Sequence, residues 1–217
     1  MLPSSSEDKL ELTYQTELRQ AIQEGDEKMD VYIIFTDTKT SLSKMIKAYT
    51  RHPYSHVSVA FSPELTEVYS FGRKDANNAW NGGFVKEDMH NHLFQRAQCA
   101  VFKCTVEASA YEAMKDYVLA MEQQHEKYKY NLTGLVGVVL KKDFGGENSF
   151  FCSQFVAEVL KQGGMEVAGK PPSLTMPRDI FCAEPLQFLY SGPLTEYPKL
   201  MAKTSYLTEN PILMEAL

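Results

Sequence analysis

The run Asp30–Thr36 (DVYIIFT) constrains the fold most, because its β-branched and aromatic residues follow one another without polar alternation. Such a run predicts a strand buried on both faces, which requires a sheet covered on each side by other elements. With 217 residues, of which 44% are apolar, the chain can build a sizeable core. It needs neither disulfides nor a metal to hold that core.

The segment His56–Ser62 (HVSVAFS) alternates between two sets of residues, the pattern of a strand with two different faces. Ser62-Pro63-Glu64 predicts a turn, and Glu67–Phe71 (EVYSF) predicts the returning strand of a hairpin. The stretch Gly72–Gly83 that follows is rich in Asn and Gly and is predicted to be a loop.

Further patterns outline the rest of the chain. Strands are expected at Gln98–Val106 and Leu186–Tyr190, and a short helix or buried loop at Lys127–Leu140. Glu107–His125 predicts a long helix whose inward residues are Tyr111, Met114, Val118 and Met121. The predicted organisation is a helical appendage over residues 1–28, a domain over 29–198 and a tail over 199–217.

Composition excludes several classes of protein. The 28 acidic and 22 basic residues give a net charge of −6, which argues against a nucleic-acid binder. The N-terminus lacks a basic region followed by an apolar one, and the longest apolar stretch, Leu132–Leu140, is too short to span a membrane. We therefore expect a cytoplasmic protein with free thiols; the sequence does not indicate the oligomeric state.

Cys152 is the strongest candidate for chemistry. The segment Ser149–Cys152 (SFFC) predicts a helix start, and with Ser149 as N-cap the cysteine lies in the first turn. Unpaired N–H groups and the helix dipole stabilise a thiolate there. The alternative is a buried structural cysteine, which is what most free cysteines are.

His56 is the second candidate, since it stands at the mouth of a predicted strand. A thiolate nucleophile needs an imidazole to form an ion pair and to protonate the leaving group. The ring needs a third group to orient it, and the neighbouring predicted strand offers Ser70 and Glu67. Both remain open as candidates, and a histidine that merely ends a strand is the alternative for His56.

These segments together resemble a known family. The pair SHVSVAF and EVYSFG, followed by YKYN and FFCSQFVAEVL, is similar to the circularly permuted branch of the NlpC/P60 superfamily, which includes YiiX-like proteins and lecithin retinol acyltransferase relatives. His56 precedes Cys152, which is the permuted order. The resemblance runs from about Val31 to about Phe181.

The resemblance implies an α+β, papain-like fold in which an antiparallel sheet packs against helices, the cysteine helix among them. It implies Cys152 as nucleophile, His56 as general base and acid, and Ser70 in the orienting position. Tyr130 matches an aromatic residue near the family's cysteine, and Gln154 of the CSQFV block is expected to contact substrate.

Other residues carry weaker patterns. Arg73, just beyond the hairpin, is expected to bind an anionic group of a ligand, with a solvated loop as the alternative. His90 and His92 have no Cys or carboxylate at ligand spacing, so no metal site is expected. Because no phosphate-binding or dinucleotide motif occurs, no cofactor is expected either.

The sequence thus favours a cysteine hydrolase or acyltransferase that acts on an amide, ester or thioester through a thioacyl-enzyme. The substrate class stays open among small molecules, peptides and lipids. The alternatives are a non-catalytic module that binds a lipid, amino acid or peptide in the same cleft, and a structural or interaction domain.

Overall fold

The structure is a computed structural model that describes residues 27–75, 78–130 and 148–200. The predicted N-terminal helix, most of the predicted tail and the greater part of Lys127–Leu140 lie outside the described residues. In chain order the elements are β1 (Lys28–Asp37), α2 (Ser41–Thr50), β2 (His56–Ala60), β3 (Val68–Asp75), β4 (Asn78–Glu87), β5 (Gln98–Glu107), α3 (Ala108–Gln123), η1 (His125–Lys127), β6 (Lys129–Tyr130), β7 (Ser149–Phe150), α5 (Cys152–Gln162), η2 (Pro172–Leu174), α6 (Pro177–Phe181), β8 (Gln187–Pro193) and η3 (Leu194–Glu196).

A six-stranded antiparallel sheet forms the centre of the fold, in the order β4-β3-β2-β1-β5-β8. The apolar run predicted to be buried on both faces lies in β1, near the middle of this sheet, and Val31–Phe35 is buried throughout. The fold is therefore α+β. The strand predicted at Gln98–Val106 is confirmed as β5.

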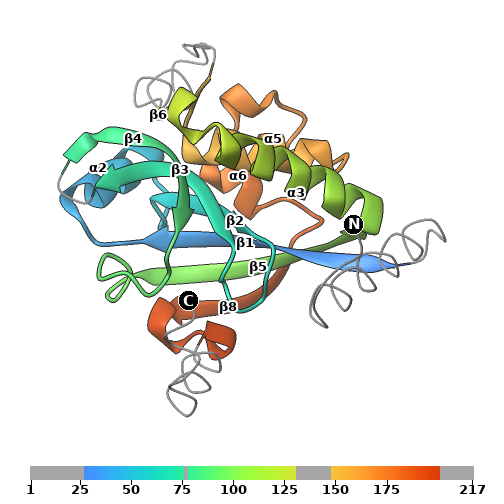
Figure 1. Cartoon of the computed structure of the whole chain (residues 1–217). Coiled ribbons are helices and arrows are strands. Elements are labelled where there is room, and N and C mark those ends of the chain that lie inside the picture. The colour runs from blue at the N-terminus through green and yellow to red at the C-terminus, as the bar shows by residue number, and fades with distance from the viewer. Residues whose placement is uncertain (1–26, 76–77, 131–147, 201–217) are drawn as a thin grey trace, which may run out of the picture.

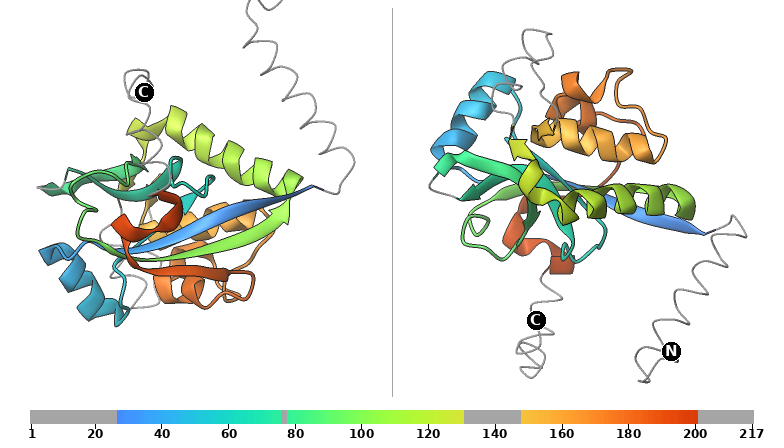
Figure 2. Two further views of the ribbon diagram at one scale, coloured as in Figure 1. Left: turned by 90° about the horizontal axis from the view of Figure 1, so that it is seen from below. Right: turned by 45° about the horizontal axis from the view of Figure 1, so that its top comes forward.

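Each face of the sheet has its own apolar layer. Ile33 and Phe35 point to the face covered by α3 and α5, whereas Ile34 points to the opposite face, where Leu194 packs. Figures 1 and 2 show α3, α5 and α6 on one side of the sheet and the chain around η3 on the other. The period of two along β1 thus supplies both layers from one strand.

The helix α3 is the predicted long helix, and its inward residues Tyr111, Met114, Val118 and Met121 are all buried. α5 buries Phe155, Val156 and Val159 in the same layer. Because these residues recur at helical spacing, one face of α5 is fixed against the sheet and its first turn is held at a defined place. Within the described ranges, no helix has the length and apolar character needed to cross a bilayer.

The loop predicted over Gly72–Gly83 is wrong. β3 continues to Asp75 and β4 begins at Asn78, and the backbone pairs Gly72 with Gly83 and Arg73 with Gly82. The ladder hydrogen bonds come from the backbone, so residues of low strand propensity extend a hairpin when a partner strand is in register. The consequence is a long fourth strand, whose last residue is Glu87.

Candidate active site

The strand register places four polar residues on one face of β2, β3 and β4. Ala60 lies opposite Val68, and Val68 lies opposite Glu87. Residues opposite each other in an antiparallel pair point to the same face, and every second residue along a strand repeats that face. The residues brought together in this way are His56, Ser58, Ser70 and Glu87.

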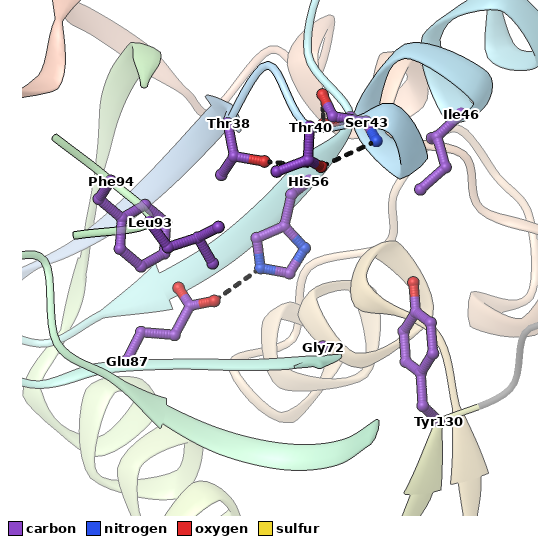
Figure 3. Close-up of a pocket in the computed structure, with 11 residues that line it drawn as sticks. Thr38, Thr40, Ser43, Ile46, His56, Gly72, Glu87, Leu93, Phe94 and Tyr130 are labelled. Carbon is purple, nitrogen blue, oxygen red and sulfur yellow. Dashed lines mark hydrogen bonds and ion pairs between the residues drawn. The ribbon is translucent and has the colours of Figure 1, made fainter. Parts of the chain in front are cut away.

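The side chain of Glu87 is the centre of a hydrogen-bonded cluster. His56 Nε2 lies 2.7 Å from Oε1 of Glu87, an interaction that a dashed line marks in Figure 3. The hydroxyl of Ser70 donates to the same oxygen at 2.8 Å, and that of Ser58 donates to Oε2 at 2.6 Å. The Glu87 side chain is only 8% exposed, so these three donors replace the water that it has lost.

Charge and burial act against each other in this cluster. Burial by itself would lower the pKa of His56, but the Glu87 carboxylate and hydrogen bonds to Cys152 and Glu87 raise it to about 10. Burial likewise would raise the pKa of Glu87, but the His56 charge and the three donors hold it below its usual value. The site therefore favours an imidazolium bound to a carboxylate at neutral pH.

Cys152 is the first residue of α5 and is buried. Its thiol lies close enough to His56 to contribute to the raised pKa of the ring. Since Nε2 of the ring is taken by Glu87, Nδ1 is the ring nitrogen left for Cys152. The fold thus puts His56 between a thiol and a carboxylate.

The local start of α5 differs from the sequence prediction. The N-cap is Phe151 rather than Ser149, and Ser149 instead belongs to β7, which pairs with β6. Cys152 is therefore the first helical position, whereas Ser149 as N-cap would have made it the third. The Ser153 hydroxyl donates to the carbonyl of Thr175 at 2.8 Å, which ties this first turn to the η2 region.

The group that orients His56 is neither of the two candidates taken from the sequence. The Ser70 hydroxyl contacts Glu87, so it acts on the carboxylate and not directly on the ring. Glu67 precedes β3, and its carboxylate lies 3.3 Å from Lys115 Nζ. Glu87 was missed because its strand was not recognised; Phe84–Glu87 (FVKE) is two apolar residues followed by two charged ones, so no alternation indicated a strand there.

The three residues expected to bind substrate lie in different surroundings. Tyr130, in β6, lines the same pocket as His56. Gln154 is buried in the first turn of α5, and its Oε1 has no hydrogen-bond partner among the described residues. Arg73 lies in β3, and its side chain is outside what the structure describes.

A small cavity of about 70 Å³ opens beside His56, and we call it the His56 pocket (Figure 3). Its described lining includes His56 but not Cys152. Hydroxyl and apolar side chains share the wall. The lining residues are Thr38, Thr40, Ser43, Ile46, Ser55, His56, Gly72, Glu87, Leu93, Phe94 and Tyr130.

Gly82 allows Tyr130 to approach the sheet. A β-carbon on residue 82 would lie 2.7 Å from the Tyr130 β-carbon and 2.8 Å from the Gly72 carbonyl oxygen. Gly82→Ala is therefore expected to lower the free energy of unfolding by about 1–3 kcal/mol, measured by urea denaturation. Gly163→Ala is the control, because there the new methyl meets the flexible end of Met114. Equal losses in the two variants would contradict this account.

Comparisons with known proteins do not assign the chain to a family. None of the protein-family models searched matches the chain, and no curated protein matches it significantly. Across residues 27–75, 78–130 and 148–200, no three His, Cys, Asp or Glu side chains are grouped so that they could hold a metal ion. The site must therefore be interpreted from its own geometry.

Proposed function

We propose that this protein is a cysteine hydrolase or acyltransferase of the permuted NlpC/P60 type, with a papain-like arrangement of sheet and cysteine helix. The observation that carries the proposal is the position of His56, whose pKa is raised by the neighbouring Cys152 and which is hydrogen-bonded to the buried Glu87 carboxylate. Nucleophile, base and orienting group within mutual reach form the constellation that acyl transfer requires.

Each group has a defined part in the reaction. Cys152, as a thiolate paired with the His56 imidazolium, attacks the carbonyl carbon of an amide, ester or thioester. His56 then gives its proton to the leaving group, and a thioacyl-enzyme remains. Water or another acceptor loses a proton to His56 as it attacks, which releases the product and restores the thiolate.

The start of α5 supplies a place for the oxyanion of the tetrahedral intermediate. The backbone N–H of Cys152, at the first helical position, has no acceptor within the helix. Such N–H groups, together with the positive end of the helix dipole, stabilise negative charge that develops next to the nucleophile. Glu87 holds the imidazole in one orientation and balances its charge.

Two further observations support the proposal. The order of His56 before Cys152 in the chain, with the cysteine on a helix that packs on an antiparallel sheet, is what the resemblance implies. A serine as the orienting group would favour the binding-module alternative, because a neutral hydroxyl stabilises an imidazolium less than a carboxylate does. Because a carboxylate contacts His56 instead, that reason no longer applies.

The direct test is thiol reactivity. After brief treatment with iodoacetamide at neutral pH, Cys152 is expected to be labelled on the order of tenfold faster than Cys182, because an adjacent imidazolium favours the thiolate. Cys182 is exposed and serves as the accessible reference. Cys99 and Cys104 are buried, and burial raises the pKa of each thiol, that of Cys99 to about 12, so both should stay unlabelled.

Peptide mapping by mass spectrometry gives the four labelling rates in one sample. The variant His56→Ala removes the imidazole and should bring the rate of Cys152 down to or below that of Cys182. If Cys152 is unlabelled in the intact protein, or its rate is unchanged by His56→Ala, the protein has no activated nucleophile and the enzymatic proposal fails.

A further inference from the structure

One wall of the His56 pocket is built from hydroxyl groups. Thr38, Thr40, Ser43 and Ser55 come from the end of β1, the start of α2 and the residue before β2. Figure 3 shows Thr38 and Thr40 close together beside His56, across the pocket from Tyr130. Ile46, Leu93 and Phe94 supply the apolar part of the lining.

Hydrogen bonds fix this wall in place. The Ser43 hydroxyl donates to Asp37, whose other carboxylate oxygen binds Lys47. Ser43 and Ser55 lie 2.8 Å apart through their hydroxyl oxygens. The backbone N–H of Ser43 donates to Thr40 Oγ1 at 3.2 Å, which makes Thr40 the N-cap of α2. The hydroxyls therefore stand in one arrangement before any ligand arrives.

Charge is arranged so that little of it faces the pocket. Lys47, which belongs to the hydrogen-bond network of this wall, is paired with the buried carboxylate of Asp37. In the described lining, His56 and Glu87 are the two ionisable side chains besides Tyr130. Those two neutralise each other, so the described lining offers no unpaired cation to an anion that enters, and the anion would lose its water without compensation.

The position of the pocket indicates which part of a substrate it receives. His56 gives its proton to the leaving group, so the leaving atom must lie on the His56 side of the carbonyl carbon. The described lining includes His56 and does not include Cys152. The same place receives the acceptor in the second half of the reaction, because that half reverses the first.

We infer that the His56 pocket is the subsite for the leaving group and for the acceptor, and that it takes a small neutral group that forms hydrogen bonds, such as a primary amide or a hydroxyl. This inference rests on the proposed function. A cavity of about 70 Å³ is roughly half the size of one that holds benzene, so it suits about three or four heavy atoms. Thr38 and Thr40 supply hydroxyl partners for the group.

The chemistry to be tested is acyl transfer to an amine. Cys152 displaces p-nitrophenolate from p-nitrophenyl acetate, forming the C–S bond as the C–O bond breaks. p-Nitrophenolate leaves without a proton from His56, so the thioacyl-enzyme forms even though the pocket does not fit it. Because p-nitrophenolate takes no proton from it, the His56 imidazolium first releases its proton to water. An amine then attacks the thioester carbon, the neutral His56 imidazole takes its proton, and the C–S bond breaks to give the N-acetyl product and the thiolate.

The experiment compares two acceptors of nearly equal size: glycinamide carries a neutral primary amide where glycine carries a carboxylate. The preference is the ratio of N-acetyl glycinamide to N-acetyl glycine formed from equal concentrations. The intact protein is expected to show a preference that falls about threefold to tenfold in Thr38→Val, the range of a lost neutral hydrogen bond. Intrinsic amine reactivity cancels, since it is the same for both proteins.

Two variants make the result specific. Thr38→Ser keeps the hydroxyl and should retain the preference, which separates a lost hydrogen bond from a disturbed fold. Thr66→Val makes the same change at an exposed threonine whose hydroxyl contacts Ser62, and it should also retain the preference. If the intact protein, Thr38→Val and Thr38→Ser all show the same preference for glycinamide, the assignment of the His56 pocket as the subsite is overturned.

The outcomes for function and subsite can be told apart. If no burst of p-nitrophenolate forms and Cys152 carries no acetyl group, the proposed function fails. If the burst forms but glycinamide has no advantage that depends on Thr38, the function stands and the subsite inference is overturned. A burst with a Thr38-dependent preference for glycinamide supports both.

Discussion

Replacing Glu87 by Gln is expected to slow the alkylation of Cys152 at neutral pH by about a hundredfold, the lower end of what a positioned proton-transfer pair contributes. The change keeps the size of the side chain and removes its charge. The pKa of His56, which Glu87 helps to raise to about 10, then falls because burial of the imidazolium is no longer opposed by the carboxylate. Cys152 loses its cationic partner.

The pH dependence gives the sign of this effect. In the intact protein His56 keeps its proton until the pH approaches about 10, so the ion pair persists through the neutral and mildly alkaline range. In Glu87→Gln the proton is lost at lower pH. The ratio of the two alkylation rates should therefore be largest in the neutral range and shrink as the pH approaches 10, where the intact protein loses the imidazolium as well.

Glu67→Gln is the matched control, because it makes the same change at a carboxylate that contacts Lys115 instead of His56. It should leave the alkylation rate of Cys152 unchanged. Ser70→Ala removes one of the two hydroxyl donors to Glu87 and should slow the reaction only a few fold. A loss in Glu67→Gln as large as that in Glu87→Gln would refute Glu87 as the orienting group.

The second large effect is on stability. His56→Ala leaves the Glu87 carboxylate buried without its cation and should lower the free energy of unfolding by about 3–5 kcal/mol. The double variant His56→Ala with Glu87→Ala removes both charges and should lose less than the sum of the two single variants. Urea denaturation of all four proteins measures this coupling.

The pH dependence of the unfolding free energy follows from His56. Its pKa is about 10 in the folded protein, against 6.5 for an ordinary histidine, so the folded state holds a proton that the unfolded chain releases between these values. This contribution is full below pH 6.5 and is lost as the pH rises towards 10. The decline should be absent from the double variant.

Glu87 acts in the opposite direction at low pH. Its pKa is lowered in the folded protein, so its contribution is present above the ordinary value of 4.5 and is lost as the pH falls through the folded value. The half-buried pair of Lys115 and Glu67 at the surface is the control, since Lys115→Ala should cost about 0–1 kcal/mol. Full additivity of the His56 and Glu87 variants would mean that the buried pair is not coupled.

Local patterns determined much of the fold in advance. The apolar run of β1, the alternation in β2 and the inward residues of α3 were all identified from the spacing of side chains. These features depend on residues that are close in sequence, within one or two turns of a helix or a few residues of a strand. The pattern also placed Cys152 in the first turn of a helix, although Phe151 proved to be the N-cap.

The tertiary structure decided what lies next to what. Glu87 reaches His56 only because β3 and β4 pair in the register that sets Val68 opposite Glu87, through a segment whose glycines and asparagines predicted a loop. Pairing between two strands depends on the residues of both, so the sequence of either strand alone does not predict its partner or its register. The sequence by itself indicated the Cys152 thiol and the His56 imidazole as candidates. The register of the sheet added the Glu87 carboxylate, so that His56 lies between this carboxylate and the thiol.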